Sequence, residues 1–389
     1  MSALALLPGE IVGAFRSRFQ SRAEPGVYRA PGRVNLIGEH TDYNLGFVFP
    51  IALEMACYVA IAPAKHGQVQ IYSRDFDEQV EIGVQEIGTA KPSGKWSDYA
   101  VGVAQQLANA GIGLESSDLY IASEVPVGSG LSSSAALEIA AAFALLGSRS
   151  MPPLEIAQLG RRAETQFVGM PCGIMDQYAS VFGRKGSAVQ IDCRSLQHEY
   201  VTLPEQVSIV AVNSMVKHEL GTSAYRERVT ECQAAVTAIQ AFDKTVESLR
   251  DVSFSFFKQI EDSIPPVPRR RARHVISDTQ RVLDLAAAAR ANDLPEMGRL
   301  FIASHRSMQY DYEISCEEID FLVDTAIKIP GVYGSRMTGG GFGGCTVNLL
   351  APESIGQFRD RLAKAYQERF SKSPVFYDCE AAAGAGRLH

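Results

Sequence analysis

The alternation of apolar and polar positions predicts both strands and helices along this chain. Segments rich in valine, isoleucine and tyrosine indicate strands at 55–64 and 69–74. At 118–125 apolar residues alternate with others, as they do in a strand with one buried face. The stretch VYRAPGRVNLIGEH, which starts at residue 27, is expected to begin as a strand and to continue as a loop.

Helices are expected where longer apolar runs carry start and stop signals. The strongest covers 132–147, which serines open and Gly147 closes. Pro152 and Pro153 open a second helix that continues through Val168, and a third carries IMDQYASVF after the loop GMPCG. Further long helices are expected at 224–242, 274–291, 294–308 and 315–328.

This mixture of elements predicts an α+β chain with two domains. A length of 389 residues is enough for about two domains of ordinary size, each with its own core. The apolar segment VSIVAVNS (207–214) looks like the start of a second half, so the boundary is expected near 195–205. We therefore divide the chain into residues 1–200 and 201–389.

Composition and charge narrow the class of partner. With 46% hydrophobic and 21% charged residues, the chain is typical of soluble globular proteins. Its formal net charge of -7 argues against nucleic acid or an anionic membrane as a partner. Neither a membrane span nor a signal peptide is expected from the sequence. The basic cluster PRRRARH (268–274) is interpreted as the solvated face of a helix start.

The cysteine pattern indicates free thiols in a reducing cytoplasm. The seven cysteines are scattered, odd in number and contain no C-x-x-C pair, and the seven histidines show no metal-ligand spacing. This pattern fits buried free thiols better than disulfides or a zinc site. The cysteines are Cys57, Cys172, Cys193, Cys232, Cys316, Cys345 and Cys379.

The stretch PVGSGLSSSAALEIA (126–140) has the features of an anion site. It places Gly-x-Gly and a row of serines between a predicted strand and a predicted helix. The first N–H groups of a helix are unpaired and carry partial positive charge, and glycines let a phosphate approach the backbone. The alternative is a turn with a serine N-cap. A P-loop is excluded, because Leu131 and Ser132 stand where that motif needs lysine and serine or threonine.

A second glycine-rich stretch, MTGGGFGGCTV, matches G-x-G-x-x-G at Gly339, Gly341 and Gly344. That pattern binds dinucleotides only where a helix follows it, and here a strand follows. We therefore expect a loop that packs beside a phosphate site by close backbone approach.

The stretch GRVNLIGEHTDYN (32–44) concentrates polar side chains. Glu39, His40 and Asp42 suit a metal site, acid–base catalysis or recognition of hydroxyl groups. Their spacing fits no common helical zinc pattern, so a polyol ligand is favoured, with a simple polar turn as the alternative. Asp176 near a helix start suits either capping or catalysis, and Glu164 alone is typical of a solvated helix residue.

These motifs together resemble a known family. GRVNLIGEHTDYN is similar to the galactokinase signature, and PVGSGLSSSAALE and MTGGGFGGCTV resemble the second and third motifs of the GHMP kinases. MPCGIMDQ, HELGTSAYRERVTEC, RARHV, DYEISC and GVYGSRMTGG also resemble galactokinases, so the likeness covers nearly the whole chain. The resemblance implies a two-domain α+β GHMP kinase fold with its active site in the cleft between the domains.

The resemblance also implies roles for individual residues. Asp176 and Arg33 are expected to be catalytic, and Ser134 and Glu164 to bind Mg²⁺. The galactose ligands are expected to be Glu39, His40, Thr41, Asp42, Gly173 and Tyr225. The ATP ligands are expected to be Trp96, beside adenine, and the phosphate loop Gly128, Ser129, Gly130, Leu131, Ser132, Ser133 and Ser134.

The implied reaction is transfer of the γ-phosphoryl group of MgATP to O1 of α-D-galactose, the first committed step of galactose breakdown. Asp176 would take the proton of the C1 hydroxyl, or mainly orient that hydroxyl, because Arg33 nearby stabilises the carboxylate and weakens it as a base. The alternatives are a kinase for N-acetylgalactosamine or arabinose, and a galactose sensor without activity. The intact GLSSSA motif argues against the sensor. A monomer is the default expectation.

Overall fold

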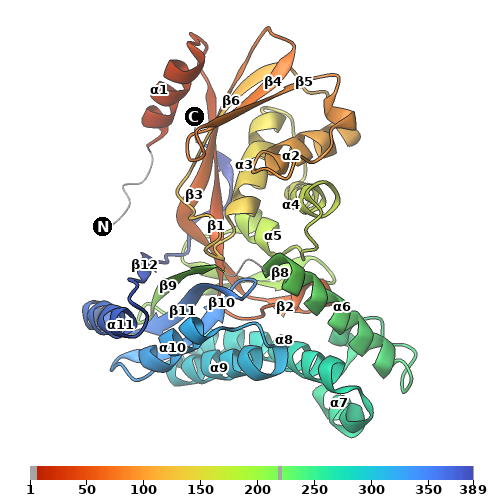
Figure 1. Ribbon diagram of the computed structural model, residues 1–389, viewed down its shortest axis with the longest axis vertical. Coiled ribbons are helices and arrows are strands. Elements are labelled where there is room, and N and C mark those ends of the chain that lie inside the picture. The colour runs from red at the N-terminus through yellow and green to blue at the C-terminus, as the bar shows by residue number, and fades with distance from the viewer. Residues whose placement is uncertain (1–6, 218–220, 389) are drawn as a thin grey trace.

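The computed structural model describes residues 7–217 and 221–388. Figure 1 shows a tall molecule in which an upper part, formed mainly by the N-terminal half, stands on a lower part formed mainly by the C-terminal half. Both parts combine sheets with helices, which confirms the predicted α+β class.

The upper part is built on a six-stranded sheet with the order β13-β1-β3-β6-β4-β5. Neighbouring strands are antiparallel, except that β4 and β6 run parallel. The ladder between β1 and β3 shifts register between Pro31 and Arg33, and such a shift bends a strand and redirects the side chains that follow. The strands are β1 (Gly26–Asn35), β3 (Pro50–Pro63), β4 (Gln68–Ser73), β5 (Glu78–Gly83), β6 (Ser117–Ser123) and β13 (Gly386–Arg387).

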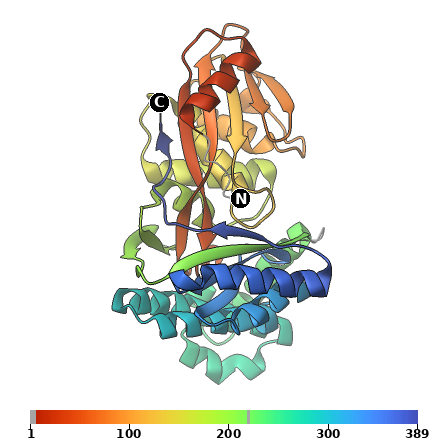
Figure 2. The same ribbon diagram turned by 90° about the vertical axis from the view of Figure 1, so that its left-hand side faces the viewer.

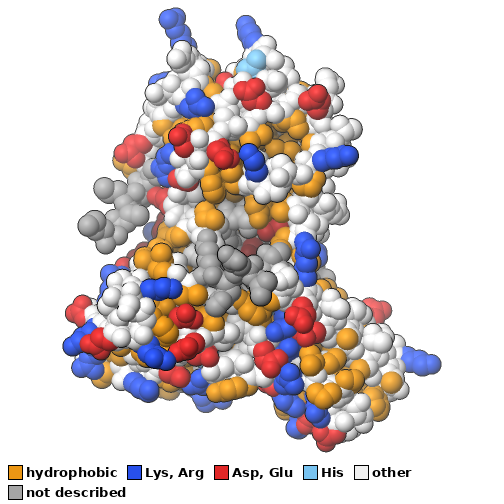
Figure 3. Space-filling model, viewed as in Figure 1, with side chains coloured by type: hydrophobic (Ala, Val, Ile, Leu, Met, Phe, Trp, Pro, Cys, Tyr) orange, Lys and Arg blue, Asp and Glu red, His pale blue; other side chains and the backbone are white. Residues whose placement is uncertain are grey.

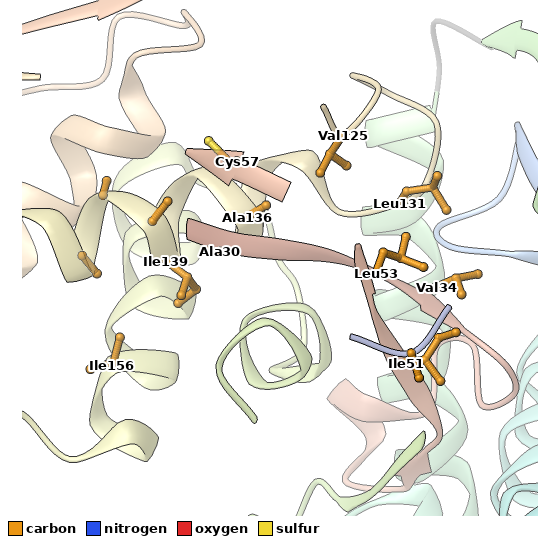
Figure 4. Close-up of a cluster of buried hydrophobic side chains, with 14 of the residues drawn as sticks. Ala30, Val34, Ile51, Leu53, Cys57, Val125, Leu131, Ala136, Ile139 and Ile156 are labelled. Atoms are coloured by element: carbon orange, nitrogen blue, oxygen red, sulfur yellow. The ribbon is translucent and has the colours of Figure 1, made fainter. Parts of the chain in front are cut away.

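Helices cover both faces of this sheet because successive strand residues point to opposite sides. On one face, Ala30 and Cys57 share a buried cluster with Ala136 and Ile139 of α3 (Figure 4). On the other face, α1 contributes residues such as Phe15 to a separate buried cluster. The helices are α1 (Pro8–Phe19), α2 (Asp98–Asn109), α3 (Ser133–Leu146), α4 (Pro153–Arg162), its π-helical continuation η3 (Ala163–Val168) and α5 (Met175–Phe182).

The lower part contains a four-stranded sheet, ordered β10-β11-β9-β12, and a three-stranded sheet, ordered β2-β7-β8. The strands are β2 (Phe47–Val48), β7 (Ser187–Asp192), β8 (Gln197–Thr202), β9 (Ser208–Lys217), β10 (Val332–Thr338), β11 (Gly343–Leu350) and β12 (Val375–Asp378). The helices are α6 (Gly221–Ile239), α7 (Phe254–Ile260), α8 (Pro266–Ala291), α9 (Leu294–Ser307), α10 (Glu317–Ala326) and α11 (Ile355–Phe370). Short helical turns are η1 (Asp42–Asn44), η2 (Ile87–Thr89), η4 (Leu249–Asp251), η5 (Glu261–Ser263), η6 (Met308–Tyr312) and η7 (Pro352–Ser354).

The C-terminal end of the chain returns to the first sheet. Figure 2 shows this segment running from the lower part back up the molecule. There β13 pairs with β1, with Arg387 opposite Tyr28. The last residues described therefore contribute to the upper part, although they follow the whole lower part in sequence.

The predicted helices lie close to the observed ones, but α8 begins at Pro266, eight residues before the predicted start at 274. The run of prolines at 265, 266 and 268 resembles a helix breaker in the sequence. Proline is nevertheless tolerated in the first turn, where its missing N–H has no intrahelical partner to lose. The helices α1, α2, α7 and α11 were not predicted.

The interpretation of the basic cluster 268–274 as a solvated face was wrong. Arg271 is 2% exposed and pairs with Glu231 and Glu313, both at 2.7 Å. His274 is fully buried. The first turns of α8 pack against α6 and η6, so most of these side chains face carboxylates instead of solvent. The view in Figure 3 shows basic and acidic side chains intermingled over the surface.

Candidate active site

One cavity of about 280 Å³ brings together residues that lie far apart in the sequence. They come from β1 and the loop after it, from the loop between β6 and α3 and the start of α3, from η3, the segment after it and the start of α5, from α6, and from the loop between β10 and β11. The predicted site residues that line the cavity are Arg33, Glu39, His40, Asp42, Gly128, Gly130, Ser132, Ser133, Ser134, Glu164, Gly173, Asp176 and Tyr225.

Trp96 lines a second cavity, described below, and three further predicted ligands do not line this one. Thr41 is fully buried, and its hydroxyl lies 2.8 Å from the carbonyl of Gly38 and 2.6 Å from that of Phe47. Ser129 is 1% exposed and donates to a backbone carbonyl of its own loop at 2.7 Å. Leu131 belongs to the hydrophobic core. In this structure these residues shape the loops that carry their neighbours.

The carboxylate of Asp176 is held by the side chains of Arg33 and Ser132. The Arg33 guanidinium makes a two-pronged contact with its carboxylate, Nε to Oδ1 and Nη2 to Oδ2, both at 2.9 Å. The Ser132 hydroxyl donates to Oδ2 at 2.5 Å. Ser132 precedes α3 with a φ of 62° and makes no side-chain capping bond, so the alternative of a simple serine N-cap was wrong. The same arginine donates to the carbonyl of Gly130, which ties Asp176 to the glycine loop.

Glu39 lies between the two parts of the molecule. Its side chain is 1% exposed and forms an ion pair with Arg336 of β10, which is itself fully buried. Its other oxygen accepts from the Thr338 hydroxyl at 3.1 Å and from the Gly339 N–H at 3.2 Å. Burial nevertheless raises the pKa of Glu39, and Arg336 opposes that effect. Both oxygens of the carboxylate therefore have protein partners.

His40 is a neutral imidazole in this setting. Burial lowers its pKa to about 3. Nε2 lies 3.1 Å from the carbonyl of Gly340, so this nitrogen must carry the proton, and Nδ1 then accepts from the Tyr43 hydroxyl at 2.8 Å. Its ring also contacts Tyr225, with centroids 4.8 Å apart. With both nitrogens engaged by protein groups, His40 is not arranged as a metal ligand.

Asp42 and Gly173 fit together closely. A Cβ atom on Gly173 would lie 1.8 Å from a carboxylate oxygen of Asp42, so any side chain there would displace that carboxylate. Burial raises the pKa of Asp42 to about 6, and the negative charge of Asp176 adds to the effect. Gly173 thus leaves space for an acidic group that faces the cavity.

Glu164 and Ser134 both line the polar cavity and contact each other. The Ser134 hydroxyl lies 3.2 Å from Oε1 of Glu164. The other oxygen accepts from the Gln177 amide at 2.7 Å, and the same amide reaches the buried Glu138 at 2.8 Å. Burial raises the pKa of Glu164 to about 6, with a further contribution from Asp176. The interpretation of Glu164 as a solvated helix residue was wrong.

A second cavity, of about 570 Å³, adjoins the first at Gly128, Ser133 and Ser134. Trp96 lies on its wall and is stacked on Phe76, with the ring centroids 5.5 Å apart and the planes 4° from parallel. The indole N–H of Trp96 donates to Glu78 at 2.9 Å. The glycine loop therefore joins a polar cavity to one that carries a fixed aromatic ring.

The second glycine stretch packs against this loop, as the sequence analysis predicted. A Cβ atom on Gly339 would lie 3.0 Å from the carbonyl oxygen of Gly130, and one on Gly344 would lie 3.0 Å from that of Ser129. Both glycines also have positive φ values. Side chains at these positions would push the two loops apart.

Sequence reasoning missed several residues of the site. Arg336 stood inside a quoted motif, GSRMTGG, but nothing in the pattern linked it to Glu39, 297 positions away. Glu138 carried a signal of its own, because a glutamate stands in the otherwise apolar helix SSAALEIAAAFALL. Phe76 lies in a polar turn, and a single exposed aromatic residue does not by itself indicate a binding site.

Comparison with known family models gives three matches along the chain. The galactokinase galactose-binding signature matches residues 13–63, the GHMP kinase N-terminal domain residues 98–184, and the GHMP kinase C-terminal domain residues 285–368.

Among the described residues there is no group of three or more His, Cys, Asp or Glu side chains suited to a metal. None of the described helices is long and apolar enough to cross a membrane.

Whole-chain relatives agree with these matches. The chain is 45% identical to a galactokinase of Roseiflexus sp. over 97% of both chains, and 43% identical to one of Chloroflexus aurantiacus over 93% of both. A crystal structure of Lactococcus lactis galactokinase complexed with galactose matches with a TM-score of 0.94 at 34% identity, over 98% of this chain and 99% of that one. A mevalonate kinase at 18% identity, with a TM-score of 0.64, shares the fold. The chain therefore belongs to the galactokinase family of the GHMP kinases.

Proposed function

We propose that this chain transfers the γ-phosphoryl group of MgATP to O1 of α-D-galactose, giving galactose 1-phosphate and ADP. The observation that supports this most directly is the position of Asp176, held by Arg33 and Ser132, in the polar cavity beside the glycine loop. A nucleotide in the larger cavity would direct its phosphates along that loop toward Asp176. Its base would lie beside Trp96.

Galactose would occupy the polar cavity. Its hydroxyl groups need several hydrogen-bonding partners, and Glu39, His40, Asp42, Tyr225 and the backbone at Gly173 all face that space. The L. lactis enzyme, which matches over nearly the full chain, was crystallised with galactose. We assign Thr41 to the support of this loop, because both acceptors of its hydroxyl are backbone carbonyls.

In the proposed reaction, O1 of the sugar forms a bond to the γ-phosphorus while the bond to the ADP oxygen breaks. The proton of the C1 hydroxyl passes to Asp176. Arg33 and Ser132 already donate to this carboxylate, so its first task is to orient the hydroxyl, and it takes the proton late in the transfer. Arg33 also places positive charge where the transferring phosphoryl group would lie.

The residues present fit Mg²⁺ bound together with the nucleotide. Mg²⁺ commonly takes one or two carboxylates and leaves its other positions to phosphates and water. Glu164 and the Ser134 hydroxyl offer such a set, and burial together with the charge of Asp176 raises the pKa of Glu164. When bound, the cation would neutralise charge on the phosphates.

The assignment is tested by ADP release from MgATP across galactose, N-acetylgalactosamine, arabinose, glucose, mevalonate and homoserine. We expect turnover with galactose to exceed that with every other acceptor. Preference for another sugar would retain the kinase and overturn the galactose ligands. Absence of turnover, with galactose still bound in a calorimeter, would identify a sensor.

Gly173→Ala should impair galactose use selectively. The added methyl group overlaps the carboxylate of Asp42, so one of the two must move. We expect kcat/KM for galactose to fall about 10- to 100-fold, in line with about 1–3 kcal/mol for a displaced ligand. The KM for ATP should change little. Steady-state kinetics with each substrate varied in turn would show this, and an equal loss for both substrates would contradict it.

The pH dependence of catalysis should reflect the carboxyl groups of Asp42 and Glu164. Both have pKa values raised to about 6. A protonated Asp42 cannot accept from a sugar hydroxyl, and a protonated Glu164 cannot bind a cation. We therefore expect kcat/KM for galactose, which reports ionisations of the enzyme form that galactose binds, to fall as the pH drops through about 6. A profile that stays flat between pH 7 and 5 would contradict this.

The same two groups should affect the stability of the ligand-free protein in the opposite sense. Folding favours their neutral forms, so the stability they contribute is present below their unfolded pKa values and is lost as the pH rises through about 6. The shifts correspond to about 3 kcal/mol for Asp42 and about 2 kcal/mol for Glu164. Melting temperatures of the wild type and Asp42→Asn should therefore converge as the pH falls from 8 to 5.

Trp96 provides a direct probe of nucleotide binding, because it is the single tryptophan of the chain. MgADP should change its fluorescence in a saturable way, and Phe76→Ala should weaken that response by releasing the stacked indole. We expect the ADP affinity to fall about 3- to 10-fold, as loss of one aromatic contact would predict. Galactose affinity should stay constant. Equal losses for both ligands would indicate general damage instead.

We also propose that the N-terminal domain ends near residue 200, with the short strand β13 as a later addition to its sheet.

A cytoplasmic location is supported by the free state of all seven cysteines. We propose a monomer, which sedimentation or light scattering would test.

A further inference from the structure

A third hollow, of about 380 Å³, lies behind the loop that carries Gly173. Its walls include Tyr43, Cys172, Arg161 and Arg226. Cys172 also lines the polar cavity, so the segment 169–173 has the proposed sugar site on one side and this hollow on the other. Nothing in the proposed reaction uses the hollow.

Two arginines hold the segment from different directions. Arg161, near the end of α4, donates from Nε to the carbonyl of Cys172 at 3.2 Å. Arg226, in the second turn of α6, donates from Nη2 to the carbonyl of Gly169 at 2.7 Å. One arginine therefore comes from the upper part of the molecule and the other from the lower part, and each fixes one end of the same short segment.

Neither arginine forms an ion pair with a described residue, although the charge of Arg161 opposes the rise in the pKa of Asp42. Within residues 7–217 and 221–388, no carboxylate lies within ion-pair distance of Arg161 or Arg226, and no acidic residue lines the hollow. Arg228, two residues after Arg226 in the same helix, differs in this respect, because it forms an ion pair with Glu231 at 2.9 Å. A guanidinium has five N–H donors, and each of the two arginines uses only one of them in the contacts described above.

We propose that Arg161 and Arg226 form a binding site for a phosphate group, supplied by inorganic phosphate or by a phosphomonoester. Planar guanidinium groups suit tetrahedral oxyanions, because two N–H donors reach two oxygens at once. A phosphate that bridges both arginines would link the two parts of the molecule. It would also fix the segment 169–173 in the position that the sugar site requires, and so favour galactose binding.

Calorimetry with inorganic phosphate tests the site directly. The phosphate loop is first saturated with a non-hydrolysable MgATP analogue, and ionic strength is held constant. Arg161→Gln combined with Arg226→Gln should weaken phosphate binding at least 10-fold. Arg162→Gln, a neighbour on α4 that does not line the hollow, should leave it unchanged. Equal binding by all three proteins, or none by the wild type, would overturn the proposal.

Glycerol 3-phosphate separates the two sources of the group. If it binds at least 10-fold more tightly than inorganic phosphate, and only with both arginines present, the site takes phosphomonoesters. Similar affinities that depend on both arginines identify a site for free phosphate. Binding of the ester that survives the double substitution would place it elsewhere and count against the proposal.

The effect on galactose rests on the proposed function and is measured separately. Saturating phosphate should tighten galactose binding at least 3-fold in the wild type and have no effect in the double variant. Galactose binding that ignores phosphate would overturn the coupling. Complete failure of the wild type to bind galactose would instead count against the proposed function.

Discussion

Asp176→Asn is expected to lower kcat by a factor of about 10³ or more, because this change removes both the proton acceptor and the charge that orders the site. Asparagine has nearly the same shape, so the polar cavity should keep its form. It can accept only through its single oxygen, and its amide group would face the donors of Arg33 and Ser132. Galactose affinity, measured by calorimetry, should remain within about threefold of the wild type.

Ser132→Ala is the matched control for this prediction. It removes one of the donors to Asp176 but leaves the two-pronged contact with Arg33 intact. We expect a loss of about tenfold in kcat, the usual scale for one hydrogen bond to a charged group. Near-wild-type turnover by Asp176→Asn would refute both roles proposed for Asp176, as a proton acceptor and as an orienting group.

Short motifs in the sequence predicted the parts of the site that are local. Glycine, serine and polar residues at fixed spacing identified the loop before α3 and the stretch after β1, since backbone geometry limits which residues can form such turns. The pairing of Arg33 with Asp176 could be expected only from the family resemblance. The two lie 143 positions apart, and no local pattern encodes a contact of that range.

Interior polar contacts were the hardest part to predict. The amide of Gln177 joins Glu138 to Glu164. Gln177 and Glu164 are ordinary helix residues by their neighbours in sequence, and only Glu138 stands out, in an apolar helix. Their meaning depends on the packing of α3, α5 and η3 around one point. Buried carboxyl groups need a polar partner, so a glutamate in an apolar helix predicts that a partner exists without identifying it.

Helix α11 was not predicted, although its sequence does contain a helical pattern of apolar residues. Phe358, Leu362 and Tyr366 follow one another at intervals of four and are all fully buried. This spacing places them on one face of a helix. The pattern was therefore readable from the sequence, and the omission was one of interpretation.

Arg336→Met should be the most damaging substitution away from Asp176. Arg336 and Glu39 are both almost completely buried, and Arg336 also donates to the carbonyl of Leu36 at 2.8 Å. Removal of one partner leaves a buried charge unpaired, which costs about 3–5 kcal/mol. We expect a marked fall in the free energy of unfolding, measured in urea. We also expect kcat/KM for galactose to fall about 100-fold, because Glu39 loses the contact that positions it.

The double variant Glu39→Gln with Arg336→Met separates stability from function. With both charges gone, this pair leaves no unpaired charge behind, so most of the lost stability should return. Galactose use should stay low, because the glutamine lacks the negative charge that a sugar hydroxyl would meet. Recovery of stability and activity together would show that Glu39 contributes nothing to sugar binding. Recovery of neither would show that Arg336 acts mainly through the carbonyls of the loop after β1, and that its contact with Glu39 is secondary.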